Sequence, residues 1–283
     1  MPAKYKVLCA LLYVSFATMN PAHGADQAPA LHSSDQVIPS LHNEHHVTAG
    51  NMLTTEEVNL KFKNPDREAP HPEMASCLYW EKVSWKAYHD INTSYLEDNR
   101  SFELDIRDLK QTKFDVLKWP ARKEIYLCYS TRRGITLFDP ESQVHLRIIR
   151  GFGWNILDYI THKIEDQSKA YGYSTYDMVM RNNGLTVIWE IEIDRLVQNF
   201  VSLKYLPEPE RKKFIEMTNA RFRSCQLLSD FAGNALYAQG GTRAGPATGS
   251  YHLKLLQSLH ADLAEIYNEA AFAYSTPPEP GSR

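Results

Sequence analysis

The stretch EMASCLYWEKVSWKAYHDINTSY, residues 73–95, decides the fold that the sequence predicts. Its apolar and sulfur-containing side chains recur at steps of three, four or multiples of these, namely Cys77, Trp80, Tyr88, Ile91 and Tyr95. Residues at that spacing share one face of an α-helix. The pattern therefore predicts a first long helix over about residues 72–99, with this stripe turned toward the core.

The spacing of apolar residues changes after residue 100. Apolar and charged side chains alternate over a short strand-like stretch, and residues 123–138, KEIYLCYSTRRGITLF, predict two strands joined by a turn. Gly134 suits that turn because glycine adopts a positive φ without steric cost. Residues 143–150, QVHLRIIR, add a candidate third strand. The sequence thus predicts a small β-hairpin within residues 101–150.

The remaining patterns are helical. Residues 54–57, TTEE, form a capping box that opens a short helix. Apolar repeats predict further helices over 154–166, 174–184 and 185–203, although the first half of the last segment also alternates. Residues 208–238 and 250–267 predict a long helical hairpin across a glycine-rich loop. The expected fold class is mainly α with a small β-hairpin (α+β), a helical bundle whose first and last long segments dock together.

The N-terminus has the pattern of an export signal. Lys4 and Lys6 precede an apolar run over residues 7–19, and Ala22 and Gly24 offer a small-x-small cleavage site. The run is shorter than the roughly 20 residues needed to span a bilayer. We expect residues 1–24 to be removed, leaving a periplasmic or secreted protein with no stable membrane insertion.

The mature chain divides by composition into an arm, a domain and a tail. Residues 25–53 lack an apolar period and predict a disordered arm. Residues 54–275 predict a single mostly helical domain that carries the hairpin as an insertion, and residues 276–283 a tail. The arm places His42, His45 and His46 together, a density of imidazoles that can bind zinc or copper. The alternative is a polar tract without metal, because no fixed fourth ligand is indicated, and no other cofactor is predicted.

The charge balance argues against nucleic acid as a partner. Removing Lys4 and Lys6 leaves 29 of the 31 basic side chains against 34 acidic ones, a net charge of −5. Phosphate binding needs clustered Lys and Arg, and the chain has no run of five or more like charges. A protein partner in the cell envelope or outside the cell fits this balance better.

Three cysteines remain after cleavage, Cys77, Cys128 and Cys225. In an oxidising compartment one pair could form a disulfide, and the sequence leaves all three pairings open. Cys77 with Cys225 is the favoured pair, because both fall inside helical patterns. Their bond would close a loop of about 150 residues, worth about 3–5 kcal/mol in the chain-entropy model.

The chain offers one weak candidate for catalysis. It contains no G-x-S-x-G pattern. Glu190 and Asp194 are four residues apart, so they would share a helix face beside Trp189, which resembles the carboxylate pair and aromatic platform of a sugar-cleaving enzyme. The alternative is an ordinary solvated helix face.

Two short motifs carry a resemblance to a known family. Met74-x-x-Cys77 is followed by Ile91-Asn92-x-x-Tyr95, and Arg221-x-x-x-Cys225 is followed by Gly240-Gly241. Over residues 73–97 and 208–270 the chain resembles the exported bacterial lysozyme-inhibitor-like family of the LprI type. The resemblance implies a helical, non-enzymatic envelope protein that binds lysozyme or another cell-wall-active enzyme.

The leading hypothesis is therefore an exported soluble protein that acts by protein binding, as an inhibitor of lysozyme-like enzymes. The alternatives are an envelope hydrolase that uses Glu190 and Asp194, and a metal-binding periplasmic protein that uses the histidine arm. A concave site that holds the two carboxylates near Trp189 would favour the hydrolase, whereas an exposed apolar patch would favour the binding protein.

Overall fold

The computed structural model describes residues 54–63, 67–88, 93–105, 118–167 and 174–274, without the side chains of residues 236–240. All of the described residues belong to one compact unit. The predicted signal peptide, the histidine arm and the tail lie outside the described residues.

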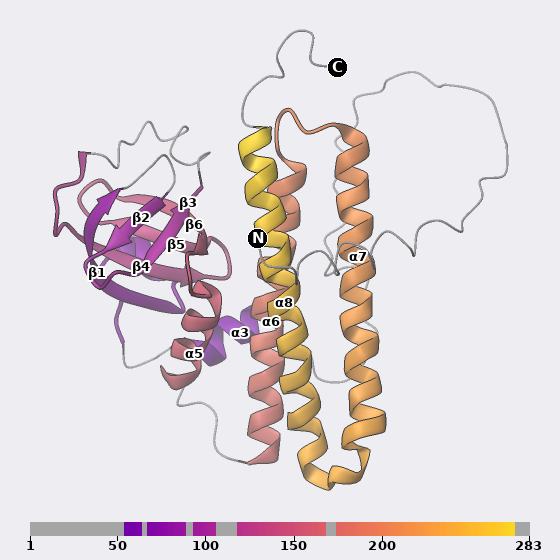
Figure 1. Ribbon diagram of the computed structural model, residues 1–283. Helices are drawn as coiled ribbons and strands as arrows, with labels where there is room; N and C mark the ends of the chain where they lie inside the picture. The colour runs from indigo at the N-terminus through magenta and orange to yellow at the C-terminus, as the bar shows by residue number, and fades with distance from the viewer. Residues whose placement is uncertain (1–53, 64–66, 89–92, 106–117, 168–173, 275–283) are drawn as a thin grey trace, which may run out of the picture. The chain divides into compact units, whose positions relative to one another are not determined.

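Six antiparallel strands close into a barrel in the order β1-β2-β3-β6-β5-β4 (Figure 1). The prediction of a mainly α helical bundle with a small hairpin is therefore wrong. The strands are β1 (Tyr79–Tyr88), β2 (Thr93–Leu96), β3 (Ser101–Leu104), β4 (Glu124–Ser130), β5 (Gly134–Asp139) and β6 (Val144–Gly151).

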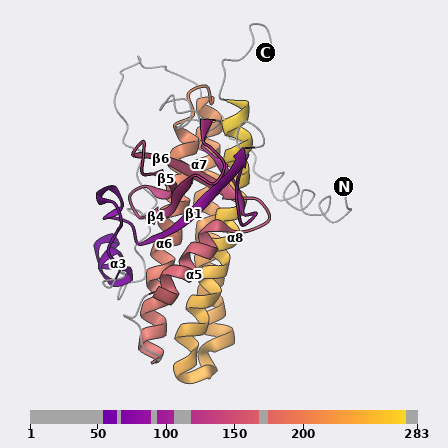
Figure 2. The ribbon, with the colours of Figure 1, turned by 90° about the vertical axis from the view of Figure 1, so that its left-hand side faces the viewer.

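The main error concerns residues 73–95: their described part contains the end of η1, strand β1 and the start of β2, and not one long helix. Strand β1 pairs with β4 from Tyr79↔Tyr129 to Ser84↔Glu124, and its other end pairs with β2. Figure 2 shows β1 beside β4. Alternate residues Tyr79, Val83 and Trp85 are buried, which is the period of a strand. Aromatic and β-branched side chains favour strands, and here pairing with a distant strand overrides the helix-like spacing.

The strands predicted after residue 100 are confirmed. They belong to the barrel wall and are not an insertion in a helical domain. Strands β4 and β5 pair from Tyr126↔Phe138 to Ser130↔Gly134, and β6 continues the meander. Strand β3 then pairs with β6, which closes the barrel opposite the β1–β4 pairing. The predicted hairpin is thus half of the barrel wall.

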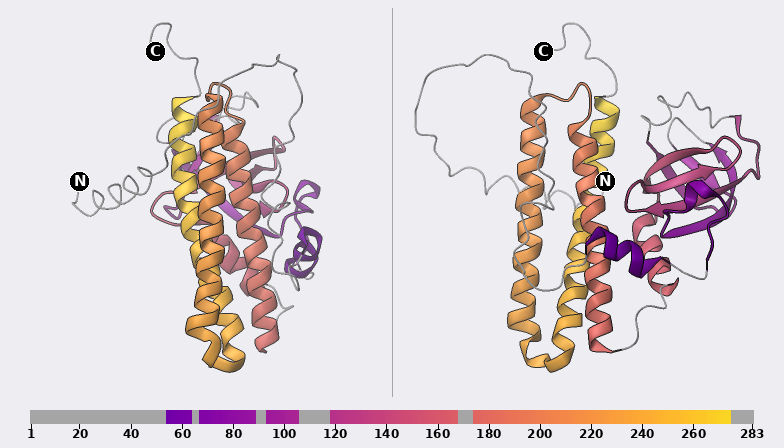
Figure 3. Two further views of the ribbon diagram at one scale, coloured as in Figure 1. Left: turned by 90° about the vertical axis from the view of Figure 1, so that its right-hand side faces the viewer. Right: turned by 180° about the vertical axis from the view of Figure 1, so that it is seen from behind.

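The described helices are α3 (Thr55–Phe62), η1 (Pro72–Met74), α5 (Ile156–Gln167), α6 (Thr175–Val201), α7 (Glu208–Phe231), η3 (Ala232–Tyr237), η4 (Ala238–Arg243) and α8 (Ala244–Ala273). The capping box of α3 is confirmed, since Thr54 Oγ1 accepts from the backbone N–H of Glu57 and the Glu57 carboxylate accepts from that of Thr54. Figure 3 shows α6, α7 and α8 side by side. Within the described part of the chain, no helix combines the length and apolarity needed to cross a bilayer.

Polar contacts join the barrel to α6 and α8. The Arg195 guanidinium on α6 donates to the carbonyl oxygens of Thr131 (2.6 Å) and Arg132 (3.0 Å) in the β4–β5 turn, and its Nε pairs with buried Glu192 (3.1 Å). These bonds hold the turn against the C-terminal third of α6.

Two further contacts reinforce the same junction. Arg147 of β6 donates to Asn199 Oδ1 of α6 (2.8 Å), and the Tyr267 hydroxyl of α8 donates to the fully buried carboxylate of Asp105 (3.3 Å). Burying a polar group costs free energy unless the group is paired. These pairs therefore favour one arrangement of α6 and α8 on the barrel.

Replacing Gly134 tests this junction. Gly134 has φ +75°, and a Cβ there would lie 2.8 Å from Arg195 Nε. We expect Gly134→Ala to lower the free energy of unfolding by about 2–4 kcal/mol, since it adds backbone strain to a steric overlap. Gly153 has the same φ, +75°, with no atom within 4 Å of a Cβ. Gly153→Ala should therefore cost only about 1 kcal/mol, and equal losses in urea unfolding would contradict the role assigned to the Arg195 contact.

Candidate functional site

An exposed apolar cluster lies at the C-terminal end of α7. Leu227, Leu228 and Phe231 are exposed to 63%, 48% and 62%; we call these three side chains the α7 patch. Leu227 and Phe231 are four residues apart, so they share a helix face. Large apolar side chains gathered in water are typical of interaction surfaces.

The packing of α7 explains why the α7 patch is exposed. Helix α7 contacts α8 more extensively than it contacts α6. Its buried positions recur at steps of three and four, namely Phe214, Thr218, Phe222, Cys225 and Ser229. Leu227, Leu228 and Phe231 fall outside this buried stripe.

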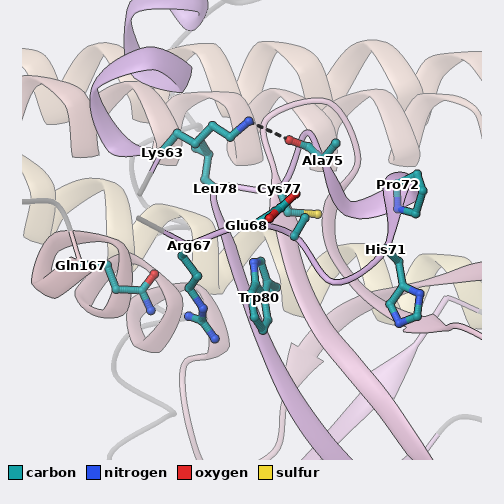
Figure 4. Close-up of a pocket in the computed structure, with 11 residues that line it drawn as sticks. Lys63, Arg67, Glu68, His71, Pro72, Ala75, Cys77, Leu78, Trp80 and Gln167 are labelled. Carbon is teal, nitrogen blue, oxygen red and sulfur yellow. Dashed lines mark hydrogen bonds between the residues drawn. The ribbon is translucent and has the colours of Figure 1, made fainter. Parts of the chain in front are cut away.

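The described residues also line an open cavity of about 680 Å³ beside the first strand (Figure 4). Its lining residues are Lys63, Arg67, Glu68, Ala69, His71, Pro72, Ala75, Cys77, Leu78, Trp80 and Gln167. The Arg67 guanidinium lies over the Trp80 ring, 3.6 Å from its centroid, and Lys63 Nζ donates to the Ala75 carbonyl (3.1 Å). Two cations thus face this cavity, together with the single carboxylate of Glu68.

Cys77 on the cavity wall lies against Cys128, which is fully buried on β4 in a small cluster with Met74 and Phe138. The neighbouring Cys128 thiol lowers the pKa of the Cys77 thiol, helped by the charges of Arg133 and Lys63 and opposed by burial. The same contact, together with burial, raises the pKa of Cys128 far above its ordinary range.

The predicted disulfide between Cys77 and Cys225 is wrong, because all three described cysteines are free. Cys225 lies on α7 within the main core, where its thiol donates to the Leu255 carbonyl of α8 (3.8 Å). Cys77 belongs to the loop before β1, so it packs against the barrel and not against α7. The helical spacing suggested Cys225 as the partner of Cys77. The pairing of β1 with β4 instead makes Cys128 its neighbour.

Glu190 and Asp194 lie on one helix, α6, as predicted. Trp189, the expected aromatic platform, is buried and cannot receive a sugar ring. Trp189 is only 1% exposed and packs edge-on against His260 of α8, with ring centroids 5.3 Å apart. Burial raises the pKa of the Glu190 carboxyl to about 7. The two carboxylates do not line the cavity described above.

The residues of the two signature motifs fall on different elements. Met74 is buried in η1 and Tyr95 lies on β2, so the first motif does not form one helix. In the second motif, Arg221 of α7 forms an ion pair with Asp262 of α8 (2.5 Å). Gly240 and Gly241 lie in η4, where Gly241 has φ +56°. Ile91 and Asn92 lie outside the described residues.

The histidine arm, with His42, His45 and His46, also lies outside the described residues, so zinc or copper binding there stays a prediction. Within the segments that the structure does describe, no group of three or more His, Cys, Asp or Glu side chains could hold a metal ion.

Comparison with protein-family models, with curated proteins and with solved structures finds no match to this chain. The resemblance to the LprI-type family therefore stays a prediction that rests on the two motifs.

Sequence patterns did not indicate the cavity. Its residues come from a loop, one 3-10 turn, the first residues of β1 and the end of α5, and the sequence placed several of them on a helix. The α7 patch did have a signal, because Leu227, Leu228 and Phe231 crowd more apolar side chains into one turn than a single buried stripe can accommodate.

The shifted pKa of Glu190 predicts a pH-dependent loss of stability. Below the ordinary value of 4.5 the carboxyl is neutral in both the folded and the unfolded chain; as the pH rises toward 7, only the unfolded chain ionises freely. Wild-type protein should therefore lose up to about 3 kcal/mol of stability between pH 4.5 and 7 through this group. Glu190→Gln should remove that loss, so urea unfolding should show the variant gaining much more on wild type at pH 8 than at pH 5.

Glu216→Gln, which changes an exposed carboxylate on α7, is the matched control. A Glu190→Gln effect of the same size at both pH values would mean that ionisation of Glu190 is not the cause.

Proposed function

We propose that this protein acts by binding another protein, with the α7 patch as its contact surface. The observation that carries the proposal is the exposure of Leu227, Leu228 and Phe231 on one turn of a helix whose buried stripe is already packed. Each solvated apolar side chain forgoes the favourable transfer from water. A partner that covers the patch would recover that free energy, and a central aromatic residue such as Phe231 is a common interface anchor.

The proposed partner is a basic cell-wall-active enzyme of the lysozyme class, met in the periplasm or outside the cell. Two features support this choice. The chain without residues 1–24 carries a net charge of −5, which favours encounter with a positively charged partner. The motifs of residues 73–97 and 208–270 resemble those of exported lysozyme inhibitors.

A second candidate function, an envelope hydrolase, has one observation in its favour. A carboxyl with a pKa near 7, such as that of Glu190, is suited to general acid catalysis at neutral pH. The burial of Trp189 favours the binding protein, because a sugar ring could not stack on that side chain.

The interaction can be measured by titrating residues 25–283 into a basic lysozyme and following binding by calorimetry and cell-wall hydrolysis by turbidity. We expect saturable binding and loss of lysozyme activity. Leu227→Ser combined with Phe231→Ser should weaken binding at least about tenfold, because truncating an interface anchor typically costs more than 1 kcal/mol.

Leu60→Ser is the matched control, since Leu60 is 80% exposed on α3, away from the α7 patch. It should leave affinity unchanged. Absence of binding by the wild type would refute the lysozyme partner, and equal affinity of the folded double variant would refute the α7 patch as the surface.

A further inference from the structure

Independently of the proposed protein binding, we propose that Cys77 is a site of thiol–disulfide exchange with small anionic disulfides, which enter the cavity beside Trp80. The reactant class is a low-molecular-weight disulfide that bears carboxylates. The product is a mixed disulfide on Cys77.

Access is the first requirement: Cys77 is only 8% exposed, so a reactant reaches it through the cavity that it lines. Its side chain lines the 680 Å³ cavity, and Figure 4 shows its sulfur among the lining groups, near Glu68. A cavity of this size falls in the range of small-molecule sites. Cys128 lies behind Cys77 with no exposed surface, so a reactant meets Cys77 first.

The groups around the sulfur favour its nucleophilic form. Thiolates, and not thiols, attack disulfides. The neighbouring Cys128 thiol and the charges of Arg133 and Lys63 stabilise the Cys77 thiolate, against the cost of burial. Arg133 is itself held in place, because it donates to the Glu73 carbonyl (3.1 Å) and contacts His145 Nε2 (2.9 Å).

The same cavity favours an anionic reactant. Lys63 and Arg67 contribute two positive charges to its wall against the one carboxylate of Glu68, and His71 completes its titratable lining. The hydrogen bond of Lys63 to Ala75 and the stacking of Arg67 on Trp80 fix where these charges lie. A carboxylate on the entering disulfide would gain from both cations, and guanidinium groups bind carboxylates well.

The other two cysteines that the structure describes do not share these features. Cys225 sits on α7 with its pKa raised by burial, and its thiol donates to the Leu255 carbonyl. Cys128 is fully buried, with its pKa raised by Cys77 and by burial. The chain therefore provides two internal comparisons for the reactivity of Cys77.

The exchange step balances as follows. Cys77 first loses its proton to solvent, and its thiolate attacks one sulfur of the disulfide R–S–S–R. A bond forms between Cys77 Sγ and that sulfur as the original S–S bond breaks, and the second half departs as the thiolate R–S⁻ with the electron pair. The Cys77 sulfur is oxidised to the mixed disulfide, while the departing half of the reagent is reduced.

The test uses two probes with the folded chain. Dithiobis(nitrobenzoate) carries two carboxylates, dithiodipyridine carries no charge, and each releases a coloured thiol or thione on attack. With the anionic probe we expect one cysteine to react at least about tenfold faster than the others. Cys77→Ser should abolish this fast phase and Cys225→Ser should keep it, with peptide mass spectrometry locating the adduct.

The charge requirement has its own variants. At low ionic strength, Lys63→Gln combined with Arg67→Gln should slow the anionic probe about tenfold and change the rate of the neutral probe less than about twofold. Glu68→Gln, which removes the opposing charge, should speed the anionic probe. A fast phase that survives Cys77→Ser would overturn the proposal, as would charge variants that alter both probes equally.

Discussion

Much of the described structure depends on the Arg195 guanidinium, which α6 presents to the turn between β4 and β5. It donates to two backbone carbonyls of that turn and pairs with buried Glu192, so one side chain joins barrel and helix. Burying a charge pair costs desolvation, and removing one member leaves the other uncompensated. Glycine at position 134 permits the turn, since any larger residue would collide with Arg195. Gly134 and Arg195, about 60 residues apart in the sequence, thus lie in contact at this junction.

Local signals predicted the local parts of this fold. The capping box at Thr54 and the strand pair across Gly134 follow from short patterns, and the structure contains both. The helices predicted separately over residues 174–184 and 185–203 form one continuous helix, α6. Residues 73–95 failed because aromatic side chains at mixed spacings fit a helix stripe as well as a strand. Their true partner, β4, lies some 40 residues further along the chain, and no short window of sequence records that pairing.

For the candidate sites, too, features set by local spacing could be predicted, and features set by packing between distant segments could not. Glu190 and Asp194 on one helix follow from a spacing of four, whereas the closure of Trp189 against His260 depends on how α6 packs on α8. Cys128 becomes the neighbour of Cys77 only through the barrel, so spacing alone suggested the wrong partner. The α7 patch shows that an apolar residue in a helical repeat is not always a core residue: α7 packs through one narrow stripe, and side chains beside that stripe remain in water.

Closure of the barrel has a consequence for how this chain meets other molecules. Each of the six strands has a hydrogen-bonded neighbour on both sides, so among the described strands there is no free edge along which a foreign strand could add. Open edges invite both strand-exchange recognition and fibrous aggregation. The described barrel gives up both, so the recognition that it can offer falls to its side chains and not to its backbone.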